Sequence, residues 1–445
     1  MISTFNLPLR VSGARVREVA RAATGEFTLI YTAPTQLRWV YLGLERMIQV
    51  ARDTGAAMVY SDRFESSGGV DLPAPVIDCQ AGALRDDFDF GGVLLYRTSI
   101  LQEAAAAVGD WKYAGLYDLR LRSSRLGPLV HIDEFLYYEV QQDSRSSGEK
   151  LFDYVDPRNR EVQMEMERVC TEHLKAVGGY LEPNFLDVDL SEGEFPVEAS
   201  VVIPCRNRVR TIGDAIRSAL SQECDFDYNV LVVDDNSTDG TVDVIRSFDD
   251  PRLIHIAQDP SWHAIGGNWN AAVFSPHCGR FALQLDSDDL YSGPDTVRRF
   301  VEAFRSQNCA MVIGSYRITD FGLNPLPPGV IDHREWTPDN GHNNALRING
   351  LGAPRGFWTP LLRRLGGFPT VKYGEDYAVA LRISRQWRIG RIYDVLYDCR
   401  RWEDNSDAAL DVVRMNANNF YKDRLRTWEL EARKALVKER SKNLH

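Results

Sequence analysis

The sequence predicts an α/β protein of two domains, with a Rossmann-like mixed sheet and flanking helices in the C-terminal half and a smaller α/β domain before it. The first observation is length, because 445 residues exceed the size at which one hydrophobic core usually stops growing. The second is the alternation of short apolar runs with segments of helical periodicity after residue 199. The third is a repetition of letters between the two halves.

The composition and net charge limit which kinds of molecule the protein is expected to bind. Hydrophobic residues make up 44% of the chain and charged residues 26%, so both halves can bury a core. Lys and Arg total 52 against 63 Asp and Glu, and the net charge of -11 argues against nucleic acid as a partner. Neither a signal-peptide core nor a run of about 18 apolar residues occurs, so we expect a cytoplasmic protein. The seven cysteines have no CxxC spacing and are expected to be free thiols.

The C-terminal half opens with a strand, a helix and a second strand. The apolar run ASVVIPCRN at 199–207 is stopped by a proline and a polar turn. Residues 211–222 carry apolar side chains at helical spacing, and NVLVV at 229–233 is the next apolar run. This order predicts a parallel pair of strands with a right-handed crossover. A further strand is expected at 281–285 (FALQL).

Acidic residues follow two of these strands. Ligands of open α/β sheets sit outside the carboxyl ends of strands, which is where Asp235 falls in the segment DDNSTDGT at 234–241. Its carboxylate can accept hydrogen bonds from a base or ribose. For Thr238 and Asp239 we prefer the alternative, a helix N-cap.

The second acidic group is Asp286-Ser287-Asp288-Asp289, after the strand at 281–285. Three carboxylates in four residues repel one another unless solvent or a cation compensates them. Mg²⁺ and Mn²⁺ prefer oxygen ligands and are held by one or two carboxylates together with substrate phosphates. The alternative is a solvated acidic turn, but the position at a strand end favours a site for a metal-bound diphosphate.

Four blocks in order, VVIPCRNR, VDDNSTDGT, LDSDD and GEDYAVALR, resemble family 2 glycosyltransferases of the GT-A fold. These are inverting enzymes of polysaccharide biosynthesis that move a sugar from a nucleotide-sugar donor to an acceptor. The resemblance implies a hexosyl- or N-acetylhexosaminyl-transferase that uses Mn²⁺ or Mg²⁺ and an acceptor such as a glycan or a lipid-linked saccharide. A UDP-sugar is the donor that family frequency favours. By the same resemblance the donor-binding residues are Pro204, Arg206, Asn207, Asp235, Asp286, Ser287 and Asp288, the metal ligands are Asp286, Asp288 and Asp289, and the catalytic residues are Asp376 and Glu375.

The chemistry of the last block is general base catalysis. An acceptor hydroxyl is a poor nucleophile near neutral pH, and a carboxylate such as Asp376 can take its proton as it attacks. Glu375 and Asp376 can at the same time be the acid pair that favours a helix start. The arginine-rich segment 397–407 is expected to form a lid or to contact the diphosphate, although Asp398 stands where processive synthases have glutamine.

Residues 330–357 form a long polar connection, which we assign to acceptor recognition. The alternative for its histidines, His333 and His342, is an ordinary surface position.

The N-terminal region repeats the C-terminal one without its acids. Residues 113–125 match 373–385 at a shift of 260 (373 − 113), and 25–27 match 279–281 at a shift of 254 (279 − 25). Residues 32–35 (Thr-Ala-Pro-Thr) replace the acidic turn, Gly115 and Leu116 replace the acid pair, and the first strand-helix-strand is expected to be missing. We therefore predict a degenerate domain at 1–150, a helical connector at 151–195, the catalytic domain at 196–407 and a helical tail at 408–445.

The remaining expectations concern partners and alternatives. The degenerate domain is expected to bind the acceptor, a partner or a second copy of the chain. The basic residues near the C-terminus favour a solvated helix end. The alternative is that they contact the anionic inner face of a membrane peripherally. Two other functions compete with the enzyme: a catalytically inactive protein that binds nucleotide-sugars or glycans, and a nucleotidyltransferase, which the lack of a glycine-rich phosphate loop disfavours.

Overall fold

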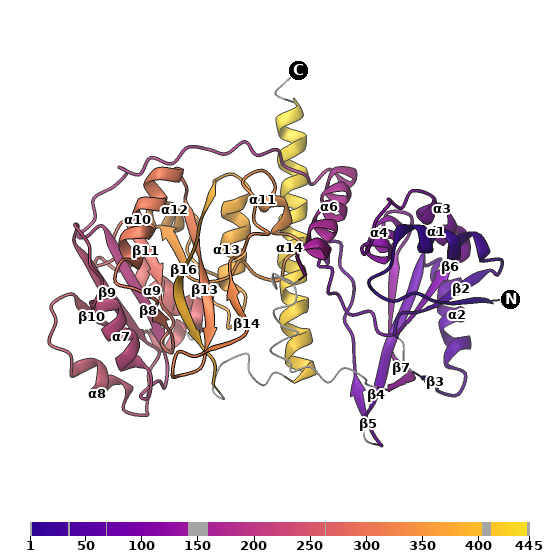
Figure 1. Ribbon diagram of the computed structural model, residues 1–445, viewed down its shortest axis with the longest axis horizontal. Helices are drawn as coiled ribbons and strands as arrows, with labels where there is room; N and C mark the ends of the chain where they lie inside the picture. The colour runs from indigo at the N-terminus through magenta and orange to yellow at the C-terminus, as the bar shows by residue number, and fades with distance from the viewer. Residues whose placement is uncertain are drawn as a thin grey trace.

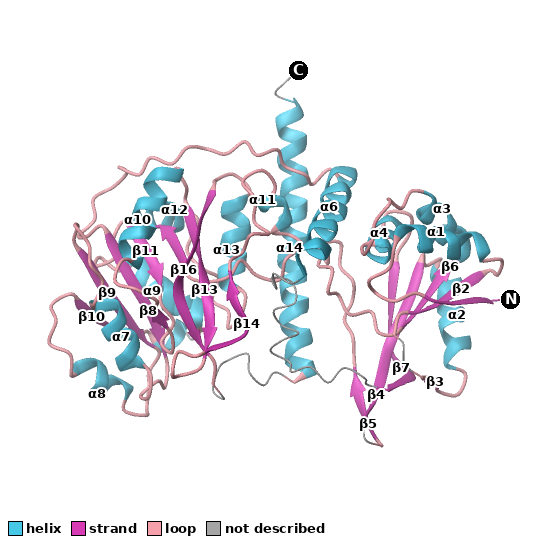
Figure 2. Ribbon diagram, in the orientation of Figure 1, coloured by secondary structure: helices cyan, strands magenta, loops and turns pink. Residues whose placement is uncertain are grey.

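The structure, a computed structural model, describes residues 2–33, 36–67, 69–140, 159–262, 264–402 and 411–442. It contains two sheets, one in each half of the chain, and the long helix α14 (Val412–Lys442) stands between them (Figure 1). Figure 2 shows helices against both sheets, so the predicted α/β class is confirmed.

The C-terminal sheet has nine strands in the order β10-β9-β8-β11-β15-β13-β16-β12, with β14 beside β13. Strands β10, β9, β8 and β11 are parallel, and β15 enters antiparallel between β11 and β13. The strands are β8 (Ala199–Cys205), β9 (Tyr228–Asp234), β10 (Leu253–Ala257), β11 (Phe281–Gln284), β12 (Leu290–Tyr291), β13 (Met311–Thr319), β14 (Pro325–Ile331), β15 (Arg355–Trp358) and β16 (Ile389–Arg400). The helices of this half are α7 (Ile212–Leu220), α8 (Thr241–Arg246), α9 (Ile265–Val273), α10 (Thr296–Gln307), α11 (Gly341–Asn344), α12 (Thr359–Arg364) and α13 (Glu375–Ser384).

The predicted strand, helix and strand are β8, α7 and β9. Every residue of β8 and β9 is buried, as expected for parallel strands covered on both faces. One face of α7 is apolar and packs against this sheet. Cys205 of β8 is level with Asp234 of β9, and Gln284 of β11 with Val202 of β8. The carboxyl ends of the three strands therefore lie at one edge.

The N-terminal sheet has seven strands in the order β1-β2-β6-β4-β7-β3, with β5 beside β4. The strands are β1 (Ile2–Asn6), β2 (Phe27–Tyr31), β3 (Leu37–Trp39), β4 (Met58–Ser67), β5 (Val70–Ala74), β6 (Val93–Arg97) and β7 (Leu129–Val140). Its helices are α1 (Gly13–Ala22), α2 (Gly43–Thr54), α3 (Thr98–Ala106) and α4 (Gly115–Ser123). The order and direction of β2-β6-β4-β7-β3 repeat those of β11-β15-β13-β16-β12, so the repeated letters correspond to a repeated topology.

A close contact between a glycine and a backbone carbonyl recurs in both halves, and one expectation about the start of the repeat was wrong. A Cβ on Gly13 would lie 1.9 Å from the carbonyl oxygen of Gly109, and a Cβ on Gly266 would lie 1.9 Å from that of Pro369. The first strand is not missing from the repeat, because β1 precedes β2 and pairs parallel with it as β8 does with β11. Helix α1 corresponds to α9 by this glycine contact, so among the described residues α7 has no counterpart in the N-terminal half. Within the described residues, the strands of the C-terminal sheet without a counterpart are β9 and β10.

Two helices join the halves. Helix α6 (Arg160–Val177) lies in the predicted connector and contacts α4 on one side and α11 on the other. Helix α14 is packed against the rest of the molecule over much of its length, and its buried residues include Asp423, Arg426 and Arg433. No helix among the described residues is long and apolar enough to cross a membrane.

Candidate active site

Asp235 lies at the end of β9, at the edge where the parallel strands terminate. It is buried, its backbone N–H donates to the carbonyl oxygen of Cys205 at 2.9 Å, and the guanidinium of Arg206 stands 3.5 Å from Oδ2. Pro204 is the penultimate residue of β8, directly beside this turn. The structure therefore brings three of the expected donor-binding residues together.

Asn207 holds the two strand-end turns together. Its φ of 53° is in the left-handed region, where asparagine is favoured among residues with a side chain. Its N–H donates to Ser237 Oγ at 2.8 Å, and its Oδ1 accepts from the N–H of Thr238 at 2.9 Å. The N-cap of α8 is Gly240, and Asp239 accepts from the N–H of Thr241 one position later. The preferred N-cap positions were thus wrong by one or two residues.

The acidic turn after β11 directs its three carboxylates to different partners. Both oxygens of Asp286 accept from Gln284 Nε2 at 3.0 Å. Asp288 Oδ2 accepts from the indole of Trp402 at 3.1 Å, and Asp289 Oδ1 accepts from the N–H of Arg400 at 2.7 Å. Ser287 is buried between them. Asp289 thus attaches the turn to the end of β16.

The electrostatics of this turn suit a divalent cation. Burial raises the pKa of Asp286, and burial followed by the charges of Asp288 and Asp286 raises that of Asp289 well above its ordinary value. The carboxylates therefore carry repulsion that a cation would relieve, and Asp286 and Asp288 fit that role. Among the described residues no three acidic, histidine or cysteine side chains converge into a complete metal site, so substrate oxygens would have to supply further ligands.

The acid pair begins α13, after Gly374 with φ of 80°. Asp376 Oδ2 forms an ion pair with Nη1 of Arg355, the first residue of β15. Arg355 Nε also donates to Gln284 Oε1 at 2.9 Å, and Gln284 holds Asp286 through its amide nitrogen. A continuous chain of four side chains therefore connects Asp376 to the acidic turn, which places both groups on one site.

Glu375 faces inward, beside a lysine that the sequence did not indicate. Burial raises the pKa of Glu375, and the nearby Asp286 raises it further, while Arg355 and Lys422 act in the opposite direction. Lys422 of α14 is buried and donates to the carbonyl oxygen of Asn349 at 2.7 Å and to the hydroxyl of Tyr373 at 2.9 Å. The sequence around Lys422 is periodic and rich in charge, as in any amphipathic helix. No local pattern therefore marked this lysine as a residue near the site.

The arginine-rich segment lies on the acidic turn. Arg400 Nε donates to the carbonyl oxygen of Asp288 at 2.5 Å, and its Nη1 stands 3.0 Å from Asp214 Oδ2. The guanidinium of Arg210 lies 5.1 Å from the ring of Trp402. Asp398 pairs with Arg317 at 2.7 Å and lies level with Leu290, the residue after the turn. Residues 403–407 of the expected lid lie outside the described residues.

The histidines of the polar connection are not surface residues. His333 is buried with Nδ1 3.2 Å from Glu335 Oε1, and His342 is buried with Nε2 2.8 Å from the carbonyl oxygen of Leu181. Burial lowers the pKa of His342 to about 4, so it is neutral near pH 7. Residues 341–348 are all buried as well, so this part of the connection is packing between α6 and α14 and the surface position was wrong.

In the N-terminal half the counterpart of the acidic turn is hydrogen-bonded to backbone carbonyl groups. Thr32 takes the place of Asp286, and its N–H donates to the carbonyl oxygen of Gly92 at 3.0 Å while its hydroxyl donates to that of Gly91 at 3.1 Å. Tyr137 accepts from the N–H of Gly92, whereas its counterpart Tyr397 accepts from the N–H of Asp286. Pro34 and Thr35 lie outside the described residues.

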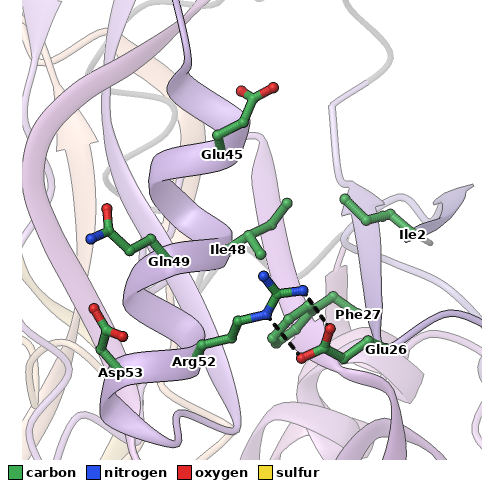
Figure 3. A pocket seen from close by; sticks show the side chains of 8 residues that line it. All are labelled: Ile2, Glu26, Phe27, Glu45, Ile48, Gln49, Arg52 and Asp53. Carbon is green, nitrogen blue, oxygen red and sulfur yellow. Dashed lines mark hydrogen bonds and ion pairs between the residues drawn. The ribbon is translucent and has the colours of Figure 1, made fainter.

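Figure 3 shows a hollow of the N-terminal half between α2 and the strands β1 and β2. Its arginine, Arg52, is held by Glu26 through Nη2 at 2.6 Å and Nε at 3.1 Å. The hollow contains none of the site residues above. It is lined by Ile2, Glu26, Phe27, Glu45, Ile48, Gln49, Arg52 and Asp53.

The mixed sheet, with acidic turns at the ends of its parallel strands, has the GT-A fold of glycosyltransferases. Residues 200–358 match the family model described as Glycosyl transferase family 2, which identifies this part of the chain as a glycosyltransferase domain.

Relatives match parts of the chain. The Succinoglycan biosynthesis protein ExoO of Rhizobium meliloti (strain 1021) is 39% identical over 105 residues, 24% of this chain and 29% of that protein. The Escherichia coli protein UDP-Glc:alpha-D-GlcNAc-diphosphoundecaprenol beta-1,3-glucosyltransferase WfgD is 24% identical over 231 residues, 52% of this chain and 84% of that protein. A crystal structure of S. aureus TarS residues 1–349 with UDP-GlcNAc is 20% identical with a TM-score of 0.40, over 51% of this chain and 70% of that chain.

Proposed function

We propose that the protein transfers a sugar, with inversion, from a nucleotide-sugar to a hydroxyl group of a glycan or lipid-linked saccharide. The observation that carries this proposal is the chain Asp376–Arg355–Gln284–Asp286, because it unites the acid of the acceptor side with the acids of the donor side. A UDP-sugar is the favoured donor, and the name of the relative WfgD, a UDP-glucose-dependent glucosyltransferase, is in keeping with it.

The donor lies along the ends of β8, β9 and β11 in this proposal. Pro204 and Asp235 border the nucleobase and ribose, Arg206 stands beside them, and Asn207 keeps the two turns in register. Asp286, Ser287 and Asp288 face the ribose and diphosphate. Asp286 and Asp288 would hold a Mn²⁺ or Mg²⁺ ion, which offsets negative charge on the leaving diphosphate. Asp289 positions the turn through its hydrogen bond to β16.

Asp376 is the proposed general base. Its Oδ2 pairs with Arg355 and its Oδ1 accepts from the N–H of Tyr377 at 2.7 Å, so its orientation is set before the acceptor arrives. The carboxylate takes the proton of the acceptor hydroxyl as that oxygen attacks the anomeric carbon. The bond from the anomeric carbon to the diphosphate breaks on the opposite face, which inverts the configuration. Glu375, whose pKa is raised by burial, lies beside Asp376 at the start of α13 and assists it in this proposal.

The N-terminal domain is proposed to support the helix that carries the base. Arg426 of α14 donates to the hydroxyl of Tyr377 at 2.9 Å and to Asp423 at 2.7 Å. Arg85 of the N-terminal domain stands 3.3 Å from the same Asp423. Binding of the acceptor, of a partner or of a second copy by this domain stays a prediction, as do the four domain limits.

The proposed location in the cell follows from the proposed lipid-linked acceptor. A cytoplasmic enzyme of lipid-linked saccharides would work at the inner face of a membrane, with the basic end of α14 (residues 434–442) toward the lipid headgroups. The second candidate function is a catalytically inactive protein that binds nucleotide-sugars or glycans with the same fold. Retention of both acidic groups in one site favours the enzyme.

The test measures donor binding and transfer separately. We expect nucleotide-sugars to raise the melting temperature only with Mn²⁺ or Mg²⁺ present, because a ligand selective for the folded state stabilises it. Asp288→Asn should lose this metal-dependent stabilisation, whereas Asp376→Asn should keep it and lose transfer. Asp249→Asn, at an exposed turn, is the matched control. Full transfer by Asp376→Asn would remove its role as base, and metal-dependent binding without transfer by the wild type to any offered acceptor would favour the inactive protein.

A further inference from the structure

A second hollow lies at the opposite end of the C-terminal sheet. It is bordered by the start of β16 and the end of α10, so it is at the edge where the parallel strands begin. Its volume is about 450 Å³, within the range of small-molecule sites. Its lining combines aromatic and basic side chains: Phe185, Trp336, His342, Arg388, Arg391 and Tyr393.

Arg391 is the most unusual member of this lining. Its side chain is only 8% exposed, and its Nε and Nη1 have no hydrogen-bond partner among the described residues. Its Nη2 has a long hydrogen bond of 3.4 Å to the carbonyl oxygen of His333. A buried guanidinium with two unpaired nitrogens costs free energy, because these donors have lost their hydrogen bonds to water without replacement. An anion in the hollow would supply the missing acceptors.

The carboxylates nearest to Arg391 are engaged with other groups. Glu335 is 3.2 Å from Nδ1 of His333, and Asp332 forms an ion pair with Arg334 at 3.0 Å. Burial lowers the pKa of Arg391 to about 10, even though Glu335, Tyr393 and Asp332 act in the opposite direction. The guanidinium therefore stays charged at neutral pH with its charge incompletely balanced.

The other walls suit a sugar ring. Tyr393 is 43% exposed and donates its hydroxyl hydrogen to the carbonyl oxygen of Trp336 at 3.3 Å, so it is held in place. Arg388 at the rim lies over the ring of Phe185 at 5.4 Å. His342, which is neutral, leaves Nδ1 without a hydrogen-bond partner in the described part of the chain. Flat aromatic faces and fixed polar groups are the features that orient small ligands in such sites.

We propose that this hollow, lined by Arg391, Arg388 and the aromatic residues, binds an acidic saccharide unit whose carboxylate or phosphate pairs with the two guanidinium groups. Arginine is suited to this role because its planar fork matches both anions. Arg400 at the acidic turn is nine positions after Arg391 along β16, which at about 3.3 Å per residue is roughly 30 Å. The site is therefore distinct from the donor site and would hold an acidic glycan at a distance from the reacting end.

Binding of matched ligands tests the proposal without any use of activity. The probes are a galacturonate disaccharide, its uncharged methyl ester, and glucose 6-phosphate, offered to the full chain and followed by calorimetry. We expect the carboxylate form to bind the wild type at least about tenfold more tightly than the ester, because the ester lacks the charge that pairs with arginine. Binding of glucose 6-phosphate instead of the uronate would identify a phosphate as the recognised anion.

The variants are Arg391→Met, which keeps an unbranched buried side chain without the charge, and Arg388→Gln at the rim. Both should weaken binding at least about tenfold, and Arg305→Gln, an exposed change on α10 outside the lining, should leave it unchanged. Arg388→Gln decides the matter if Arg391→Met does not fold. Equal affinity for uronate and ester, no binding of any probe, or unchanged binding in the folded arginine variants would overturn the proposal. Because donor binding and transfer are not measured, failure here leaves the proposed enzyme untouched.

Discussion

Replacement of Arg426 by methionine tests whether α14 holds the helix of the proposed base. The side chain is fully buried and makes four hydrogen bonds, to Tyr377, Asp423, Ile348 and Asn349, at 2.9, 2.7, 3.0 and 3.2 Å. Methionine fills much of the same space but leaves Asp423, also 0% exposed, with Arg85 at 3.3 Å as its remaining ion-pair partner. Breaking a buried pair from one side costs about 3–5 kcal/mol, mainly because the other charge remains buried.

The double variant separates that cost from simple loss of packing. Arg426→Met with Asp423→Leu removes both charges, and replacing a whole buried pair by apolar groups is often close to neutral. We therefore expect urea unfolding to give the single variant a loss of about 3–5 kcal/mol, of which the double variant recovers about half or more.

Enzyme kinetics measure whether the proposed base, Asp376, keeps its position in these variants. Since Tyr377 loses its hydrogen bond to Arg426 in both variants, we expect kcat to fall about tenfold or more, with the donor KM little changed. Arg424→Gln, at an exposed position of the same helix, is the control. A single variant within about 1 kcal/mol of the wild type, or a full kcat in a folded variant, would refute the reasoning.

Two further predictions concern the site itself. Glu375 has a pKa raised from 4.5 by burial, so the folded protein binds its proton more tightly than the unfolded chain does, and stability falls as pH rises from about 4.5 through the raised value. Glu375→Gln should therefore melt at a higher temperature than the wild type at pH 8, with the difference shrinking toward pH 4.5, and a difference independent of pH would contradict the burial argument. Trp402→Phe removes the N–H that Asp288 accepts at 3.1 Å but keeps an aromatic ring beside Arg210, so we expect a donor KM raised about tenfold at an unchanged melting temperature. An unchanged KM would exclude a role of that hydrogen bond in holding Asp288.

Patterns within short segments of sequence predicted the parallel part of the fold well. The apolar runs at 199–207, 229–233 and 281–285 became β8, β9 and β11, because strands buried on both faces must be apolar throughout. The residues after these strands were also placed correctly at one edge, since parallel strands bring their carboxyl ends together. Residue repetition at shifts of 260 and 254 indicated the second sheet before any coordinates did.

The main error of the sequence-based predictions was to expect that polar segments lie at the surface. Residues 341–348 are rich in Asn, His and Arg, a composition typical of surface loops, yet all are buried under α6 and α14. Several of their polar groups bond to partners far away in the chain, such as Asp86 for Arg347 at 2.6 Å and Leu181 for His342. Periodicity and composition contain no information about such distant partners. The first strand of the repeat was wrongly expected to be missing because the segment before Gly25 is short, yet it holds β1 and α1.

The sequence by itself determined the chemical groups of this protein and the family that its residues 200–358 match. The acids at 286–289 and 375–376 are local, and their types restrict what chemistry they can do. Only the tertiary structure decided that Gln284 and Arg355, 71 residues apart, connect these two groups, and that Lys422 and Arg426 of the last helix stand against α13. The physical reason is that residue type sets what a side chain can bond to, whereas which partner it meets depends on chain segments that only folding brings together.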